Sequence, residues 1–353
     1  MTILTLTLTP RHLQGSLFPE DAEQPCHEFS LDRDELETTL HTASNLAQCI
    51  REHLERNECP DVEAMGLRVP FGGDVFRGPV VASPEVLQAL AHLAPQSPLH
   101  LPPVLALADG LRVTYPGVPV VLIFETSFFT ALPHREQAYG LDPEHMEQMG
   151  LWRYGYHGIL HEAACREAVS RIGLPTARIV SICLEPRPEL AACVGGRPVM
   201  VTGGNTPVEG LPGERSCGDL DPSVALKLAH DLPGGLEEAN RVLTRESGLL
   251  GLVGEPVTLA ELLLSQRDDW QLARDVFRHS VLRACGAASA AISGLDMFVY
   301  SGRYASAGAA LHAWLAPRLA RATCAATPYL VQSRTLAQVM HDIVRVELCT
   351  SRA

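Results

Sequence analysis

Two side chains of catalytic type, a carboxylate and a histidine, stand in one stretch of the chain. Residues 118–124 are apolar, as in a buried strand, and Glu125 follows them directly. The motif Arg-Tyr-Gly-Tyr-His-Gly comes later and contains His157, with a second histidine, His161, four positions beyond it. A carboxylate at a strand end and a histidine beside glycine favour a site that handles an anion, because both groups can hold or move a proton.

The composition limits the class of protein. A chain of 353 residues is longer than a single hydrophobic core usually supports, so two domains are expected. Hydrophobic residues make up 46% and charged residues 20%, which excludes a disordered protein. The formal charge of −13 argues against nucleic acid as a partner, because phosphate binding needs basic patches.

Targeting and cysteine signals favour the cytoplasm. No apolar run reaches the roughly 18 residues that span a bilayer, so no membrane partner is expected. The first residues alternate apolar side chains with threonine, unlike a signal peptide. The ten cysteines include no C-x-x-C pair, so we expect free thiols in a reducing compartment and no metal-binding cluster.

Strands and helices alternate along the chain, which predicts an α/β sheet architecture. A hairpin is expected at 189–202 around Gly195-Gly196, and Ser83 is a good N-cap for a helix. The other expected elements are strands at 2–8, 118–124, 177–184, 297–300 and near 329; helices at 34–56, 102–114, 158–171, 305–319 and 336–346; mostly helical structure at 221–287; and a glycine-rich loop at 66–78.

Three motifs between residues 98 and 161 resemble the acetate kinase family in order and spacing. The chain has Pro98-Leu-His-Leu-Pro where the family carries Pro-Leu-His-Asn-Pro. It has Phe124-Glu-Thr-Ser-Phe-Phe where the family carries Phe-Asp-Thr-Ala-Phe-His. Arg153-Tyr-Gly-Tyr-His-Gly, followed by His161, is similar to the family's Arg-Tyr-Gly-Phe-His-Gly-Thr-Ser-His.

Three further segments extend the resemblance over nearly the whole chain. Gly66-Leu-Arg-Val-Pro-Phe-Gly-Gly is similar to the family's His-Arg-Val-Val-His-Gly-Gly. Asn205-Thr-Pro-Val-Glu-Gly-Leu is similar to Phe-Thr-Pro-Leu-Glu-Gly-Leu, and Arg215 with Gly218-Asp-Leu-Asp-Pro is similar to Arg-Ser-Gly-Asp-Ile-Asp-Pro. Ser247-Gly-Leu-Leu-Gly matches the family's own five residues.

The resemblance implies a fold and an activity. The fold is the two-domain actin/hexokinase/Hsp70-like (ASKHA) architecture, a duplicated ribonuclease-H-like α/β unit with an interdomain cleft. We expect one domain at 1–152 plus 332–353 and the other at 153–331. Members of the family transfer phosphate between ATP, with Mg²⁺, and a short carboxylate, and so make an acyl phosphate. They are typically cytoplasmic homodimers, and both properties become expectations for this chain.

The resemblance also implies roles for individual residues. Arg68 and Arg215 would clamp the carboxylate and phosphoryl oxygens, since a guanidinium group makes bidentate contacts with oxyanions. His157 would donate to the transferring phosphoryl group, and Glu125 stands where the family uses Asp. The remaining substrate-binding candidates are Pro70, His100, Tyr156, His161 and Pro207.

The nucleotide side departs from the family's pattern. Residues 7–14 and 183–187 stand where the family has its two phosphate loops, and the glycines that let backbone N–H groups approach a phosphate are missing. Pro10 removes a further donor. Residues 301–306 replace the family's adenosine loop, and Cys217 is inserted after Ser216.

The altered loops carry cations of their own. Arg187 lies in the second phosphate loop, and Arg303 follows Gly302 in the adenosine loop. We expect these three residues to contact the nucleotide, with the two guanidinium groups replacing backbone donors.

These differences leave three hypotheses open. The first is a working carboxylate kinase of low or altered rate, because losing one preorganised donor to a transition-state oxyanion costs about 3 kcal/mol. The second is an inactive relative that binds acyl phosphate, phosphate or carboxylate as a regulator or partner subunit. The third is an acyl-phosphate hydrolase or transferase that needs no nucleotide, in which a cleft with Arg68, Glu125, His157 and Arg215 orients a water on the phosphorus.

Overall fold

The computed structural model describes residues 1–9, 12–20, 22–32, 44–97, 100–323 and 327–350. Two compact units make up the chain. Unit 1 comprises residues 1–130 with 335–353, and unit 2 comprises residues 131–334. The domain limits expected from the sequence, 1–152 with 332–353 and 153–331, stay a prediction.

Unit 1 is built on a six-stranded sheet of order β3-β2-β1-β4-β6-β5. β1 (Ile3–Leu8), β4 (Ala64–Val69) and β6 (Val120–Phe124) run parallel, while β2 (His12–Phe18) and β3 (His27–Asp32) continue antiparallel from β1. The short β5 (Val80–Val81) closes the other edge.

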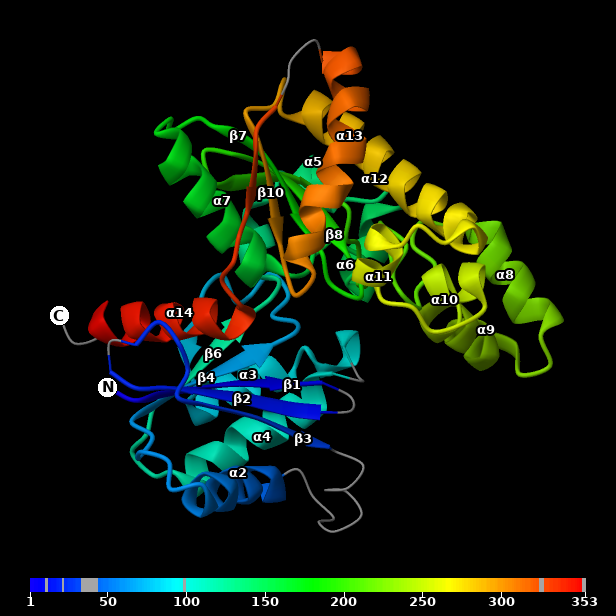
Figure 1. The fold of residues 1–353 in the computed structure, drawn as a ribbon. Helices are drawn as coiled ribbons and strands as arrows, with labels where there is room; N and C mark the ends of the chain where they lie inside the picture. The colour runs from blue at the N-terminus through cyan, green and yellow to red at the C-terminus, as the bar shows by residue number, and fades with distance from the viewer. Residues whose placement is uncertain (10–11, 21, 33–43, 98–99, 324–326, 351–353) are drawn as a thin grey trace. The chain divides into compact units, whose positions relative to one another are not determined.

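Helices cover both faces of this sheet (Figure 1). α14 (Leu336–Thr350) packs on β1, β4 and β6, and α4 (Leu101–Thr114) packs on β4 and β6 from the other side. α2 (Ser44–Arg56) and α3 (Pro84–Ala91) pack against α4. All five residues of β6 are buried, as expected of a parallel strand covered on both faces.

Unit 2 is built on a five-stranded sheet of order β11-β10-β7-β8-β9. β7 (Arg178–Cys183), β8 (Glu189–Val194) and β9 (Arg197–Val201) form an antiparallel meander, and β10 (Met297–Ser301) and β11 (Tyr329–Val331) are parallel to β7.

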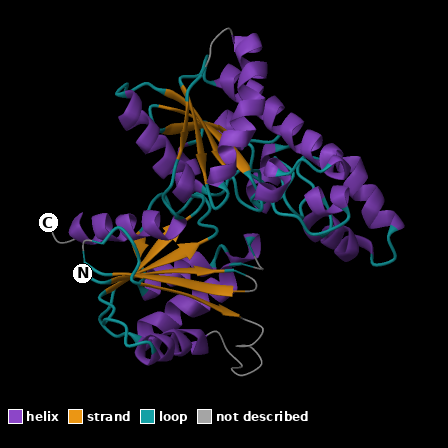
Figure 2. Ribbon diagram, viewed as in Figure 1, coloured by secondary structure: helices purple, strands orange, loops and turns teal. Residues whose placement is uncertain are grey.

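The helices of unit 2 account for most of its remaining residues (Figure 2). α7 (Gly158–Ile172) packs on β7 and β10, and α12 (Gln271–Ala291) packs on β7, β8 and β9. The other helices are α5 (His134–Gln137), α6 (Pro143–Met149), α8 (Pro222–Asp231), α9 (Gly235–Arg245), α10 (Gly248–Val253), α11 (Leu259–Leu264) and α13 (Gly308–Thr323). Short 3₁₀ segments lie in both units. They are Ala94–Gln96, Ser127–Ala131, Asp268–Trp270 and Ala305–Ala307.

The two sheets share one plan. In each, three consecutive strands form an antiparallel meander, and two later strands add in parallel beside the first strand of that meander. Unit 1 has one further strand, the short β5, which pairs antiparallel with β6. Two units that share this five-strand pattern are what a duplicated α/β unit predicts.

Most elements expected from the sequence are present. The hairpin appears as β8 and β9, the helical stretch 221–287 contains α8 to α12, and Ser83 caps α3 by accepting the Val86 N–H at 3.2 Å. The expected start of the helix at 34–56 lies outside the described residues. The helix is observed from Ser44 onward.

Two expectations about unit 1 were wrong. β2 and β3 were not expected, because their polar residues interrupt the apolar pattern of a buried strand. Gly66 was assigned to a loop, but it lies inside β4, paired with Thr5 and Val121. The side chain of Val344 on α14 occupies the space that a Cβ at Gly66 would need, since the two carbons would lie 2.8 Å apart.

A membrane span is not found in the described part of the chain, where no helix is both long and apolar enough to cross a bilayer.

Replacing Gly66 tests the close packing of α14 on the sheet. Gly66→Ala should lower the free energy of unfolding by about 1–3 kcal/mol, because the new methyl group overpacks the contact with Val344. Combining it with Val344→Ala should recover part of that loss. The double variant should therefore lose less unfolding free energy than the summed losses of Gly66→Ala and Val344→Ala. Gly78→Ala is the matched control, since nothing lies within 4 Å of its Cβ position. Denaturant unfolding measures the unchanged protein, the two single variants, the double variant and the control, and strictly additive losses would contradict the packing.

Candidate active site

Arg68 and Glu125 meet in unit 1 because their strands are parallel neighbours. Val69 pairs with Phe124, and the Glu125 N–H donates to the Val69 carbonyl at 3.0 Å. The Arg68 Nε–H donates to Glu125 Oε1 in an ion pair. Glu125 is 1% exposed, whereas the Arg68 side chain is 20% exposed. A buried carboxylate is therefore compensated by a guanidinium that still reaches the surface.

The other carboxylate oxygen, Glu125 Oε2, is buried and has no hydrogen-bond partner among the described residues. The next residue, Thr126, anchors the glycine-rich loop, since its hydroxyl accepts the Gly72 N–H at 3.0 Å. Gly72 lies against the ring of Phe124, where a Cβ would come within 2.7 Å. The glycine-rich loop thus packs against the strand end that carries Glu125, through contacts of Gly72 with Thr126 and Phe124.

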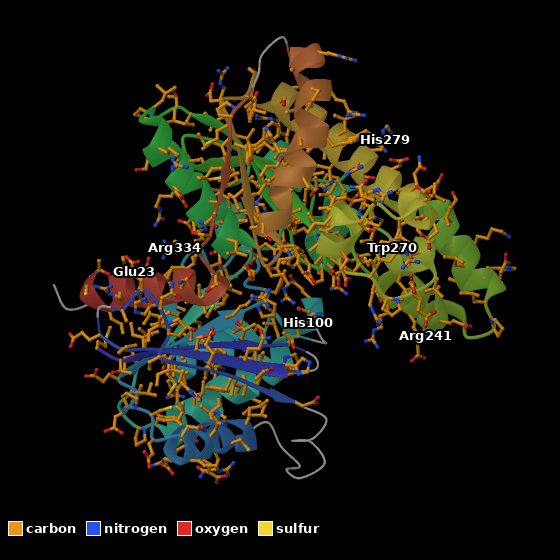
Figure 3. All side chains as sticks on the ribbon, in the orientation of Figure 1. Glu23, His100, Arg241, Trp270, His279 and Arg334 are labelled. Carbon is orange, nitrogen blue, oxygen red and sulfur yellow. The ribbon has the colours of Figure 1, made fainter. Side chains whose placement is uncertain are left out.

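Pro70 and His100, the other candidates of unit 1, are both partly buried. Pro70 follows β4 directly, two residues after Arg68. His100 is the N-cap residue of α4, and its main-chain N–H donates to the Ser97 carbonyl at 3.2 Å (Figure 3).

In unit 2, His157 has a backbone conformation that side-chain-bearing residues rarely adopt. Its φ is 53°, in the left-handed region, and it is the N-cap of α7. The His157 carbonyl accepts the N–H groups of Leu160 and His161, each at 3.0 Å. On the ring, Nε2 lies 3.0 Å from the carbonyl of Arg187. Because a carbonyl only accepts, Nε2 carries the proton, and Nδ1 becomes a donor only in the imidazolium form.

Tyr156 and His161 contact one buried carboxylate, that of Glu189. The Tyr156 N–H donates to both Glu189 oxygens, at 3.0 and 2.9 Å, and His161 Nε2 lies 3.5 Å from Oε1. His161 Nδ1 is 2.8 Å from the hydroxyl of Ser181. Complete burial lowers the pKa of His161 to about 3, with the nearby His157 adding to the effect, so the imidazole is neutral at pH 7.

The Tyr156 hydroxyl contacts the segment that begins at Asn205. It donates to the Asn205 carbonyl at 2.8 Å. Burial, reinforced by the charge of Glu189, raises the pKa of this hydroxyl well above its usual value, so it remains protonated and a donor. Pro207 lies two residues further along the same segment and is partly buried.

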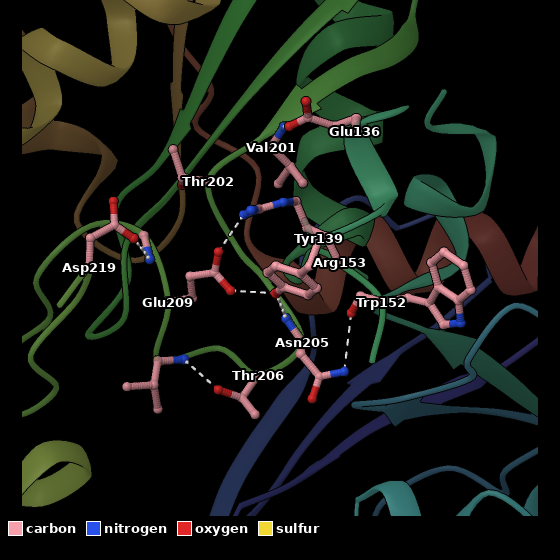
Figure 4. Close-up of polar contacts among 12 residues, drawn as sticks. Glu136, Tyr139, Trp152, Arg153, Val201, Thr202, Asn205, Thr206, Glu209 and Asp219 are labelled. Carbon is pink, nitrogen blue, oxygen red and sulfur yellow. Dashed lines mark hydrogen bonds and ion pairs between the residues drawn. The ribbon is translucent and has the colours of Figure 1, made fainter. Parts of the chain in front are cut away.

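A network around Glu209 fixes this segment (Figure 4). The Tyr139 hydroxyl donates to Glu209 Oε2, and Arg153 Nη1 forms an ion pair with Oε1 at 2.7 Å. The Asn205 N–H in turn donates to the Tyr139 hydroxyl at 2.7 Å. Gly204 leaves room for Glu209, since a Cβ there would lie 1.6 Å from Oε2. The motif that contains His157 and the motif that contains Pro207 are therefore one connected structure.

Arg215 lines an open pocket of about 250 Å³ within unit 2. Its exposed side chain has no ion pair to a carboxylate among the described residues. The other lining residues are Glu214, Leu250, Pro256, Val257, Thr258 and Glu261. The inserted Cys217 lies beside Arg215, and its N–H donates to the Leu243 carbonyl at 3.0 Å.

The segments 183–187 and 301–306 contact each other. Glu185 accepts the Arg303 N–H at 2.8 Å and the Arg303 Nε–H at 2.9 Å. Gly302 has a φ of 90°, and a Cβ there would lie 2.7 Å from the Leu184 carbonyl oxygen, so only glycine fits. Burial and the neighbouring charge of Arg245 lower the pKa of Arg187.

Most of the chain matches a known protein family. The model of the acetokinase family matches residues 23–312. This chain belongs to the acetokinase family. Among the described residues, no three His, Cys, Asp or Glu side chains form a cluster that could hold a metal ion.

Curated relatives of the family are similar over about two thirds of this chain. An acetate kinase of Syntrophobacter fumaroxidans is 34% identical over 242 residues, which cover 67% of this chain and 59% of the relative. An acetate kinase of a Synechococcus strain is 35% identical over 252 residues, covering 69% and 62%. The match thus spans about 60% of the length of these relatives.

Solved structures share the fold. The acetate kinase of Porphyromonas gingivalis has a TM-score of 0.83 at 21% identity, covering 98% of this chain and 99% of that one. A propionate kinase of Francisella tularensis has a TM-score of 0.83 at 19% identity, with the same coverage. The fold is therefore the two-domain ASKHA architecture expected from the sequence.

The sequence did not reveal four residues whose hydrogen bonds connect the segments of the candidate site: Tyr139, Glu189, Asn205 and Glu209. Glu189 was assigned only as the first residue of a hairpin strand. The signal that could have revealed it is a charged residue opening a strand that is otherwise apolar, Glu189–Val194. The contacts of Glu209 join segments up to 70 residues apart, which no local pattern reveals.

The buried His161 should make stability depend on pH. Its pKa is about 3 in the folded chain and 6.5 for a solvent-exposed histidine, so below pH 6.5 the unfolded state binds the extra proton. Proton uptake by His161 in the unfolded state should therefore lower the free energy of unfolding by about 2 kcal/mol as the pH falls from 7 to 5. Denaturant unfolding at both pH values measures it.

The His161→Gln variant should lose that share of the pH dependence, and the matched control His279→Gln, at an exposed position on α12 (Figure 3), should keep it. An unchanged pH dependence in His161→Gln would show that His161 does not cause the effect.

Proposed function

We propose that the protein is a carboxylate kinase, which transfers a phosphoryl group between ATP and a short carboxylate and so interconverts the carboxylate and its acyl phosphate. The observation that carries this proposal is the Arg68–Glu125 pair at the adjacent ends of β4 and β6. A partly exposed guanidinium, fixed in direction by a buried carboxylate, is suited to hold an oxyanion. Membership of the acetokinase family supports the reaction class.

Phosphoryl transfer needs positioning and charge neutralisation more than covalent chemistry. Glu125 orients the Arg68 guanidinium before any ligand binds, so no reorganisation is needed when charge develops on the phosphoryl oxygens. In unit 2, we assign the partly buried Arg187 and the exposed Arg215 to oxyanion binding. His157 holds its Nε2 proton on the Arg187 carbonyl, so it would donate to a phosphoryl oxygen through Nδ1 as an imidazolium.

The substrates would be ATP and a small carboxylate, with Mg²⁺ as the expected ion. Glu125 Oε2, buried and without a hydrogen-bond partner among the described residues, is the type of oxygen that Mg²⁺ takes as one ligand beside waters and phosphates. The ion would neutralise phosphate charge during transfer. The cytoplasmic location and the homodimer stay predictions.

We further propose that turnover is slow because the nucleotide loops are altered. The support is the contact of Glu185 with Arg303, in which a carboxylate already occupies the backbone and side-chain donors that a phosphate would need. The same contact favours a second candidate function, in which the protein binds an acyl phosphate or phosphate through Arg68 without turnover.

Replacing Arg68 tests the proposed reaction. Acyl phosphate formed from MgATP and acetate, propionate or butyrate is trapped with hydroxylamine and measured. Arg68→Ala should lower kcat by a factor on the order of 10²–10³, as expected for a lost oxyanion donor. Arg112→Ala is the matched control, because Arg112 is also ion-paired in unit 1 but lies on α4 with Asp109. The proposal fails if Arg68→Ala retains the activity of the unchanged protein, or if that protein forms no acyl phosphate.

Replacing Glu185 tests the cause of slow turnover. Glu185→Gln removes a negative charge from the loop and loosens its contact with Arg303, so MgATP should bind more tightly by a factor on the order of ten. Calorimetric titration measures the affinity. Glu162→Gln is the control, since Glu162 is also paired with an arginine in unit 2, at 2.6 Å on α7. Equal affinities for the unchanged protein and Glu185→Gln would contradict the role of Glu185, and no MgATP binding by either would favour the second candidate function.

A further inference from the structure

The backbone at His157 needs support from its surroundings. A non-glycine residue with a φ of 53° is disfavoured, and such a conformation persists only where neighbouring contacts determine it. Three of these contacts act on His157 itself, through its carbonyl and its ring. The support for the residue before it comes from a carboxylate.

That carboxylate is Glu189, which opens β8 and is 3% exposed. Both of its oxygens accept the Tyr156 N–H, at 3.0 and 2.9 Å. A hydrogen bond from a main-chain N–H to an ionised carboxylate is shorter and stronger than one between neutral groups. A single side chain therefore holds the peptide plane between Gly155 and Tyr156, one residue before the peptide bond to His157.

Two neighbours lie close to the carboxylate of Glu189. The Nε2 atom of His161 lies 3.5 Å from Oε1. On the other side is Gly203, where a Cβ would lie 1.8 Å from Oε2 and 3.4 Å from the Gly155 Cα. The absence of a side chain at Gly203 thus lets the carboxylate and the Gly155–His157 backbone pack together.

We infer that Glu189 is a positioning residue for His157, which fixes the direction of the imidazole by holding the Tyr156 N–H. This inference rests on the proposed function, because it concerns the histidine assigned there to the phosphoryl group. Glu189 itself touches no reacting atom. Its effect is transmitted from the Gly155–Tyr156 peptide through the backbone of Tyr156, so a change at Glu189 should alter the ring of His157 while the fold stays intact.

Two variants disturb this contact in different ways. Glu189→Gln keeps the size of the side chain but removes the charge and one acceptor, and its amide N–H₂ would face the Tyr156 N–H. Gly203→Ala keeps Glu189 but pushes its carboxylate away. Glu136→Gln is the matched control, because Glu136 is a partly buried carboxylate of unit 2 that also accepts a main-chain N–H, from Val201 at 3.1 Å.

The first readout needs no turnover. The ring Cε1–H signal of His157, assigned by its loss in His157→Gln, is recorded by NMR with and without inorganic phosphate. In Glu189→Gln and Gly203→Ala this signal should move from its position in the unchanged protein, and its response to phosphate should weaken. It should stay in place in Glu136→Gln.

The second readout is the kinase assay. Glu189→Gln should lower kcat by about tenfold to a hundredfold, as expected for a small misplacement of a catalytic group, with the KM for MgATP within about twofold. Thermal unfolding of Glu189→Gln and Glu136→Gln shows whether any loss follows stability instead.

The outcomes separate this inference from the proposed function. If the unchanged protein shows no kinase activity, the proposed function fails, and a moved His157 signal in Glu189→Gln still supports the positioning role. If the His157 signal and its response to phosphate are the same in Glu189→Gln and the unchanged protein, the inference is overturned, whatever the activity. An equal shift in Glu136→Gln would also overturn it.

Discussion

The central constraint is the buried charge of Glu125. A carboxylate that is 1% exposed is stable in a folded chain only if a cation and hydrogen bonds compensate it. Arg68 supplies that cation because β4 and β6 are parallel neighbours whose ends coincide. The cost of burying the acid thus fixes the direction of a guanidinium, and that fixed guanidinium is the basis of the proposed anion chemistry.

A comparable arrangement occurs in unit 2 around the buried carboxylate of Glu189. Its carboxylate contacts the Tyr156 N–H and lies near His161, whose burial keeps the imidazole neutral. The Glu209 network then joins the Tyr156 segment to the segment beginning at Asn205. In both units a buried carboxylate makes a nearby group rigid, and rigidity is what a phosphoryl-transfer site requires.

The sequence predicted the parts of the structure that local pattern controls. The apolar run before Glu125 predicted a buried strand with an acid at its end, and β6 has this form. The meander strands β2 and β3 were missed because their solvent-facing polar residues obscure the alternation. Gly66 was taken for a loop residue because glycine usually marks turns, whereas here the packing of Val344 requires it. The contacts of Glu189 and of Glu185 with Arg303 depend on tertiary pairing, which a single sequence does not show.

A ³¹P NMR time course of the unchanged protein with acetyl phosphate and MgADP tests the carboxylate kinase most directly. The account predicts that the signal of acetyl phosphate decreases while the β- and γ-phosphate signals of ATP grow in equal amount. Release of inorganic phosphate without ATP would instead support the nucleotide-independent hydrolase, and an unchanged spectrum would support binding without turnover. Either result would contradict the proposed function.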